Sequence, residues 1–281
     1  MTLAAPHARR AQAPHRWSWI DLVAVLVAAA FLLPLAYLLS VSFKTPDQVL
    51  TGSFLPDAPT LSNWPAAFGA TALTRFIVNS VLTAVLGGIV TILIALPAAY
   101  ACLRLDKAGE RLVSIAFGSF VAPPIVAAIP FFFLLKAAGL LNSVVGLALI
   151  YGLTNVPVAL WLLIPFLRRI PREIEDAAAI DGAGAVTTLV RVIAPLVAPG
   201  IAATGIIVVI LGYNEFLFAS VFTFADDTRT LTVGISLFQG DRLVNFGQMA
   251  AASLAGIAPI YLIALLAQRW LVAGLTEGSV K

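Results

Sequence analysis

The chain has few charged residues for its length, and this scarcity excludes most kinds of soluble protein. Charged residues occupy 11% of the 281 positions and hydrophobic residues occupy 60%, with a mean hydropathy of +1.00. Soluble domains are about 25% charged and about 45–50% apolar. A compact globule of the present composition would expose much of its apolar surface to water. We therefore expect an all-α polytopic membrane protein, not a soluble enzyme, a secreted disulfide scaffold or a disordered chain.

Cysteine and histidine are nearly absent as well. The single cysteine, Cys102, lies in an apolar stretch, so it can form neither an intrachain disulfide nor a thiolate cluster. The two histidines, His7 and His15, precede the first apolar stretch, which leaves none within the membrane to bind a metal or relay protons. The formal net charge of +3 is too small to indicate a nucleic-acid partner. We expect no metal site and no bound nucleic acid.

Six uncharged stretches are each long enough to cross a bilayer as a helix, which takes about 20 apolar residues. They are residues 22–43, 76–102, 112–135, 143–167, 192–214 and 246–268. Strands of a β-barrel would instead alternate over about ten residues. We predict six transmembrane helices within a membrane domain of residues 19–275, flanked by tails at 1–18 and 276–281. The turn at 136–142 is the shortest boundary between two of these spans.

The distribution of Lys and Arg predicts the orientation. Twelve of the 17 basic residues lie on the side of the predicted spans that holds both termini, and five lie on the other side. Because basic residues accumulate in cytoplasmic loops, both termini are expected in the cytoplasm. The first span is longer than the apolar region of a cleaved signal peptide, and about 20 residues precede it, so a retained anchor is favoured.

The predicted spans contain many prolines and several groups of small residues. Ten prolines fall inside them, and each removes a backbone donor and bends its helix unless neighbours satisfy the freed carbonyl. Gly87-Gly88 and Ala250–Ala252 allow helices to approach closely. The pattern is consistent with ordinary membrane packing and equally with a bundle that has to bend.

The loop at residues 168–191, RRIPREIEDAAAIDGAGAVTTLVR, is the one long cytoplasmic loop of this topology. Pro171 suits the first position of a helix, the acids that follow favour the positive end of the helix dipole, and three alanines continue the helix. Gly182 supplies a left-handed stop, and a second helix is expected from about Ala185. An alanine-surfaced helix can enter a groove on another protein, where its acids pair with basic residues. The alternative, a helix lying on lipid headgroups, expects basic residues beside a large apolar face.

The motif in this loop resembles the EAA loop of ABC importer permeases. Asp176-Ala177-Ala178, three residues and Gly182 are followed by Val192-Ile193-Ala194-Pro195, where the family has Glu-Ala-Ala, three residues, Gly, nine residues and Ile-x-Leu-Pro. Asp176 stands in place of Glu, and Val192 and Ala194 in place of Ile and Leu. Glu175 is adjacent to Asp176, so the motif leaves open which acid contacts the partner.

Further segments resemble the carbohydrate branch of these permeases, the maltose-permease type. They are Ala98–Ala101 at the end of the second span, Ala179–Ala183 in the loop, Tyr213–Leu217 at the end of the fifth span, and Gln268–Thr276. The resemblance covers nearly the whole chain and implies a subunit in a bacterial cytoplasmic membrane that moves a sugar or related polyol.

The resemblance implies that the loop docks on an ATPase subunit, whose ATP-driven closure rotates the permease halves. The implied coupling residues are Glu175, Asp176, Ala177, Ala178 and Gly182. The implied partners are a second permease subunit, two ATPase subunits, an extracytoplasmic solute-binding protein and membrane lipid. The chain contains no G-x-x-x-x-G-K-[ST] motif, so we expect a non-catalytic subunit without a cofactor, with ATP and Mg on the ATPase.

Polar residues within the spans are candidates for the solute path. These candidates are Asn79, Asn155, Tyr213, Asn214, Glu215 and Gln248. Polar side chains at membrane depth face either a partner helix or a water-filled path, and for Asn79, Asn155 and Gln248 hydrogen bonding between helices is the favoured alternative. Tyr213, Asn214 and Glu215 combine the aromatic, amide and carboxyl groups of a sugar site. The outer loops are expected either to receive the solute-binding protein or to be plain connections.

Two other functions compete with the importer permease. A proton- or sodium-coupled carrier usually has acids in the middle of its spans and often an internal repeat, and the sequence shows neither. An intramembrane enzyme with a serine nucleophile needs a base, and no predicted span contains a histidine or lysine. The permease subunit is the favoured prediction.

Overall fold

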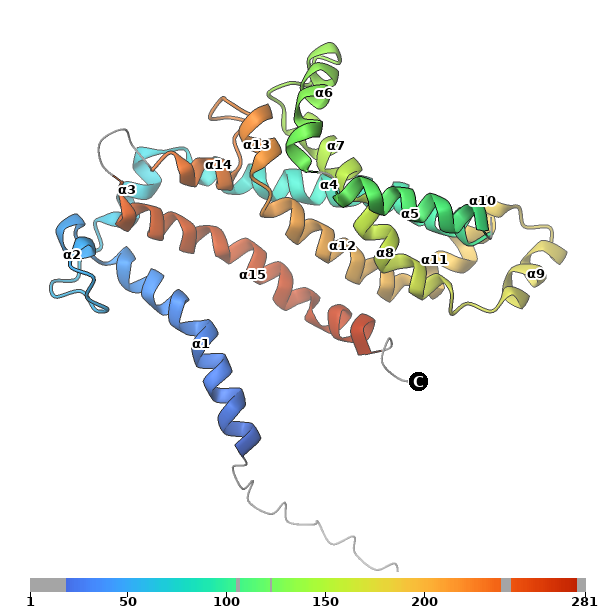
Figure 1. Cartoon of the computed structure of the whole chain (residues 1–281), viewed down its shortest axis with the longest axis horizontal. Helices are drawn as coiled ribbons and strands as arrows, with labels where there is room; N and C mark the ends of the chain where they lie inside the picture. The colour runs from blue at the N-terminus through green and yellow to red at the C-terminus, as the bar shows by residue number, and fades with distance from the viewer. Residues whose placement is uncertain (1–18, 105–106, 122, 239–243, 277–281) are drawn as a thin grey trace, which may run out of the picture.

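The computed structural model describes residues 19–104, 107–121, 123–238 and 244–276, and these ranges are helical without a strand. The expected all-α fold is therefore confirmed for the described residues. The helices form an elongated bundle with α9 at one end and α2 and α3 at the other (Figure 1). The elements are α1 Trp19–Ser42, α2 Pro46–Leu50, α3 Asn63–Ala70, α4 Leu73–Arg104, α5 Lys107–Val121, α6 Pro124–Ala137, α7 Val144–Thr154, α8 Val156–Leu167, α9 Arg172–Ile180, α10 Ala185–Thr187, the π-helix η1 Thr188–Ile193, α11 Ala194–Leu196, α12 Ala198–Tyr213, α13 Leu217–Phe222, α14 Leu231–Ser236 and α15 Phe246–Thr276.

Three helices of the described residues are each long and apolar enough to cross a membrane. They are α1, α4 and the Phe246–Leu266 part of α15, with mean hydropathies of 2.7, 2.4 and 2.1. Two bent pairs pass the same test when each pair is taken together: α7 with α8, bent by 49°, and Ala185–Leu196 with α12, bent by 84°. Length and composition thus support between three and five spans.

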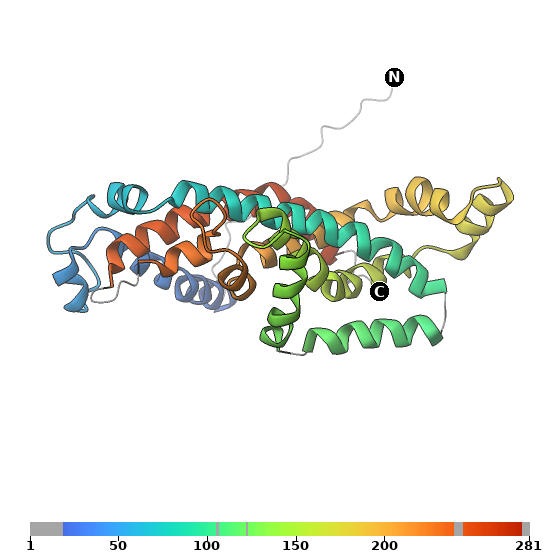
Figure 2. The same cartoon turned by 90° about the horizontal axis from the view of Figure 1, so that it is seen from above.

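The third predicted span, residues 112–135, is divided between two helices. The helix α5 has 15 residues and α6 has 14, so each is about 22 Å long at 1.5 Å per residue, short of the roughly 30 Å hydrocarbon layer. Pro123 and Pro124 lie at the break, where a proline ring displaces the preceding turn of helix. The helix α6 leaves at a steep angle to α5, which runs along α4 (Figures 1 and 2).

The fifth predicted span, residues 192–214, is also divided between two helices. A helix made of α10, η1 and α11 runs through Leu196, and α12 starts at Ala198 after the bend of 84°. Pro195 lies at the start of α11 and Pro199 at the start of α12. Proline is tolerated there because the backbone N–H groups of a first helical turn have no acceptor within the helix. Residues 192–196 therefore belong to the helix that follows the glycine turn.

The helix α4 is the centre of the bundle and packs against α7, α8, α12, α14 and α15. Glycines permit the closest of these approaches: a Cβ added to Gly87 would lie 3.0 Å from Tyr151 Cβ, and one added to Gly88 would lie 2.8 Å from Val209 Cγ2. On α15, Ala250–Ala252 are at most 2% exposed. The expectation that these small residues allow close helix approach is confirmed.

Candidate functional site

The helix α9 and the glycine turn after it form the first part of the candidate site. The chain leaves α9 in a Schellman arrangement, in which the Ala183 N–H donates to the Ala178 carbonyl at 2.9 Å and the Gly182 N–H donates to the Ala179 carbonyl at 3.0 Å. Gly182 has a φ of 81°, a left-handed conformation that glycine adopts without cost. The predicted stop at Gly182 and the second helix from Ala185 are both confirmed.

The two faces of α9 differ in what they offer. Glu175 and Ala178 are three residues apart, so they share one face, and this face turns toward the rest of the chain: Ala178 is 9% exposed. Asp176 and Ala177 are exposed. Ile180, at the end of α9, is 86% exposed. The outer face thus presents one acid, a small alanine and a large apolar side chain at one end of the bundle.

The Glu175 carboxylate is held by two residues of α4. It accepts a hydrogen bond from the Tyr100 hydroxyl at 2.7 Å and forms an ion pair with Arg104. The Arg104 guanidinium also lies over the Tyr100 ring, 5.1 Å from the ring centroid. The Glu175 side chain is 13% exposed, so of the two adjacent acids Asp176 is the one that faces outward. Sequence reasoning missed this contact, because Tyr100 and Glu175 are 75 residues apart and no local pattern pairs them.

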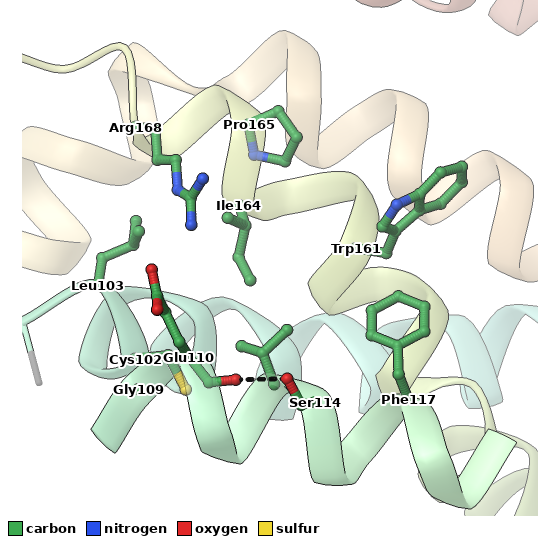
Figure 3. A pocket seen from close by; sticks show the side chains of 11 residues that line it. Cys102, Leu103, Gly109, Glu110, Ser114, Phe117, Trp161, Ile164, Pro165 and Arg168 are labelled. Atoms are coloured by element: carbon green, nitrogen blue, oxygen red, sulfur yellow. Dashed lines mark hydrogen bonds between the residues drawn. The ribbon is translucent and has the colours of Figure 1, made fainter. Parts of the chain in front are cut away.

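A pocket of about 730 Å³ opens beside this contact, between the end of α4, α5 and the end of α8. In Figure 3, Glu110 and Arg168 project toward each other from opposite walls, and the Ser114 hydroxyl donates to the Glu110 carbonyl at 2.9 Å. Trp161 and Phe117 line the other, apolar end. The pocket is therefore polar where α5 begins and apolar further along the helices.

Five of the six predicted path residues make internal hydrogen bonds, and Asn79, Asn155 and Tyr213 are three of them. The Asn79 amide donates to the carbonyls of Asp227 and Arg229, both at 2.9 Å. The Asn155 amide donates to the Tyr151 carbonyl at 2.9 Å. The Tyr213 hydroxyl donates to the Gly256 carbonyl at 2.7 Å and joins α12 to α15.

The other three path residues differ in their surroundings. The Glu215 carboxylate accepts hydrogen bonds from the N–H groups of Phe218 at 3.0 Å and Ala219 at 3.2 Å, and so caps the start of α13. Asn214 is exposed and donates to the Ile210 carbonyl at 2.8 Å. Gln248 lies half-buried on α15. Tyr213, Asn214 and Glu215 follow one another at the end of α12, and Asn79 holds the loop before α14.

The described helices form an apolar bundle that carries, at one end, an acid-alanine helix and a left-handed glycine turn, and this is the architecture expected of a membrane permease subunit. The chain belongs to the family of binding-protein-dependent transport system inner membrane components, whose profile matches residues 70–277. It is similar to the sulfoquinovosyl glycerol transport system permease protein SmoH of Agrobacterium fabrum, at 36% identity over 91% of this chain and 92% of SmoH. It is also similar to the trehalose/maltose transport system permease protein MalG of Thermococcus litoralis, at 33% identity over 92% and 94% of the two chains.

The fold of the chain matches that of a solved importer. A crystal structure of a bacterial ABC transporter involved in the import of the acidic polysaccharide alginate contains a chain that aligns with a TM-score of 0.73 and 22% identity, covering 89% of the present chain and 94% of the other. The expected identity as an ABC importer permease, located in a membrane, is confirmed. The names of SmoH and MalG agree with the expected carbohydrate branch.

Proposed function

We propose that this chain is the permease subunit of an importer that moves a sugar or a related polyol across the bacterial cytoplasmic membrane with energy from a separate ATPase. The observation that carries the proposal is the outward face of α9, where Asp176 and Ala177 are exposed beside the left-handed turn at Gly182. Relatives at 33–36% identity over nine-tenths of the chain are named for glycosidic solutes, which supports a carbohydrate as the cargo.

The proposal includes six spans with both termini in the cytoplasm. Three single helices and two bent pairs account for five spans, and α5 with α6 provides the sixth, since together they have 29 helical residues. An even number of spans places both termini on one side. The excess of Lys and Arg in the tails and in the α4–α5 and α8–α10 connections assigns that side to the cytoplasm.

Coupling is assigned to the outer face of α9. Asp176 pairs with a basic residue in a groove of the ATPase, and Ala177 permits close approach because it has no long side chain. Ala178 and Gly182 act from within: Ala178 seats α9 on its own chain and Gly182 fixes the turn. Ile180 and Val186, 86% and 76% exposed, supply apolar surface beside the acid. The chain itself is non-catalytic in this proposal, and ATP and Mg are held by two ATPase subunits.

The remaining partners are assigned to two other regions. The most apolar window of α1 has no buried residue, and α1 diverges from the bundle in Figure 1; we assign this surface to lipid and to a second permease subunit. In the connection between α6 and α7, the Asn142 side chain accepts hydrogen bonds from Phe224 N–H at 2.9 Å, Ala225 N–H at 3.2 Å and the Thr228 hydroxyl at 2.6 Å. A loop held in this way offers a fixed surface to an extracytoplasmic solute-binding protein.

We assign the main solute contacts to Asn214 and Gln248. Tyr213, Glu215 and Asn155 are assigned a secondary part in the solute path. Asn214 is exposed at the end of α12, and Gln248 is half-buried on α15. Both are more accessible than Asn79, which is only 8% exposed and whose amide holds a loop. The internal bonds of Tyr213 and Glu215 position the backbone of this region.

Reconstitution tests the proposal. The chain is assembled in liposomes with its cognate permease, ATPase and binding protein, and uptake of labelled trehalose, maltose and sulfoquinovosyl glycerol is measured with and without ATP. We expect uptake of at least one of these solutes that requires both ATP and the ATPase. Uptake by this chain alone without nucleotide would establish a self-sufficient carrier and overturn the proposal.

A further inference from the structure

Glu175, Tyr100 and Arg104 form a closed set of three contacts between α9 and α4. One carboxylate oxygen of Glu175 accepts from Tyr100 at 2.7 Å, the other pairs with Arg104, and the guanidinium of Arg104 lies 5.1 Å from the centroid of the Tyr100 ring. Backbone packing of α9 is on η1, so α4 reaches α9 through these long side chains. The Arg104 side chain is 33% exposed and that of Glu175 is 13% exposed, which shields the pair from much of the solvent.

The end of α4 adjoins open space on its other side. Successive residues of a helix are about 100° apart, so Cys102 points away from the face that carries Tyr100 and Arg104. Cys102 and Leu103 line the pocket of about 730 Å³ between α4, α5 and α8. The end of α4 is therefore attached to α9 on one side and lines this pocket on the opposite side, where Gly109 of α5 packs closely against the Cys102 backbone.

We propose that the Tyr100–Arg104–Glu175 set, named here the α4–α9 link, transmits a displacement of α9 to the central helix α4 during transport. This inference rests on the proposed function, because the displacement comes from the docked ATPase. All three are positioning residues, since none of them is assigned a contact with solute or ATPase. The two adjacent acids therefore have different roles, because Asp176 faces the partner and Glu175 faces the membrane helices.

Physical chemistry favours these contacts as the transmitting element. Hydrogen bonds that involve an ionised group are short and directional, so they resist both separation and sliding. The packing of Ala178 is non-directional by comparison. Because α4 packs against α7, α8 and α12, a movement of its end reaches the core of the bundle.

The experiment measures whether α9 and α4 move together. Spin labels are placed at Ala179→Cys on α9 and Leu93→Cys on α4, which are both exposed, in a Cys102→Ser background. The labelled full chain is assembled with its permease and ATPase partners in nanodiscs, and the distance between the labels is measured with and without Mg-AMP-PNP. We expect one distance population in both conditions for the otherwise unchanged chain.

Breaking the link is expected to separate the two helices when nucleotide binds. In Mg-AMP-PNP, Glu175→Ala and Arg104→Ala should each raise the population at the displaced distance, relative to the population at the native distance, by about tenfold. This is the change in equilibrium expected for the loss of one charge-assisted hydrogen bond. Glu173→Ala, an exposed acid on the same helix, is the matched control and should behave as the unchanged chain. The charge exchange Glu175→Arg with Arg104→Glu should restore the single population.

Two results would overturn the link, and one would overturn the proposed function instead. A single unchanged distance in both alanine variants, with the ATPase still bound, removes the link and leaves the proposed function intact. A charge exchange that fails to restore the distance after both single variants displaced it also removes the link. If the unchanged chain does not retain the ATPase on purification, the proposed function fails. Should Glu175→Ala fail to assemble, Glu175→Gln removes the charge while keeping the shape and gives the same comparison.

Discussion

The Thr91 hydroxyl on α4 lies 3.0 Å from the carbonyl oxygen of Gly152 on α7, and this hydrogen bond joins two helices whose backbones approach closely. Thr91 is fully buried, and its hydroxyl is also 2.9 Å from the Gly87 carbonyl of its own helix. A Cβ added to Gly152 would lie 2.4 Å from Val90 Cγ1. Small residues on both helices are therefore a requirement of this interface.

Replacing Gly152 by alanine should destabilise the bundle. The added methyl group forces Val90 or the α7 backbone to move, at a cost of about 1–3 kcal/mol for overpacking. Thermal unfolding in detergent should show a lowered midpoint. Gly118→Ala, at a position with no neighbouring atom within 4 Å of the added Cβ, is the control and should unfold at the original temperature. Equal midpoints for the two variants would contradict the close α4–α7 approach.

Replacing Gly182 by valine should abolish coupling without expelling the protein from the membrane. The φ of 81° costs a β-branched residue about 1–3 kcal/mol, so the turn rearranges and α9 loses its position. We expect normal membrane levels and at least about a tenfold loss of ATP-dependent uptake, since 1.4 kcal/mol corresponds to one factor of ten.

The control for this variant is Gly184→Ala. Gly184 has a φ of −73° and no atom within 4 Å of an added Cβ, so alanine fits there and uptake should persist. Wild-type uptake by the Gly182 variant would show that the left-handed turn is dispensable.

Neighbouring alanines of α9 should crosslink to different proteins. A photoreactive amino acid at Ala177, which is exposed, should form adducts with the ATPase, whereas one at Ala178, which is 9% exposed, should react within its own chain near η1. Mass spectrometry of the adducts distinguishes the two. Adducts of Ala177 with lipid alone would contradict docking and support the headgroup-lying alternative.

Replacing Asn142 by alanine should loosen the loop before α14. The variant removes the oxygen that accepts from Phe224, Ala225 and Thr228 and places alanine at a φ of 54°. Loss of about 1 kcal/mol per hydrogen bond predicts at least about tenfold faster amide exchange at residues 224 and 225. Asn142→Asp keeps the accepting oxygen and should preserve the slow exchange. Unchanged exchange in the alanine variant would show that other contacts hold the loop.

Local chemistry made the helix α9 and the glycine turn after it predictable from the sequence. Pro171, the acids that follow it and the three alanines each favour one part of a short helix, and Gly182 ends it, so the prediction required no long-range contact. The long uncharged stretches likewise follow from composition, since α1, α4 and α15 coincide with the first, second and sixth predicted spans to within a few residues at their starts.

Contacts between segments far apart in the chain could not be predicted from the sequence. Tyr100 and Glu175 are 75 residues apart, and Asn79 reaches the carbonyl of Asp227 across 148; neither pairing has a local signature. Hydropathy also overlooked the break within residues 112–135, because averaging over an apolar run conceals the effect of Pro123 and Pro124 on helix continuity. The roles of Asn79 and Glu215 as structural hydrogen-bonding groups depend on these same long-range or loop geometries.

The length of α4 has a consequence for how such chains can change over time. With 32 residues it measures about 48 Å, well over the roughly 30 Å hydrocarbon thickness, so its last turns extend toward α9. Inserting two residues before Tyr100 would rotate this overhang by about 200° and direct the tyrosine and arginine away from Glu175, whereas inserting a whole number of turns would keep them in phase. Insertions and deletions in α4 are thus constrained by rotational register as well as by span length.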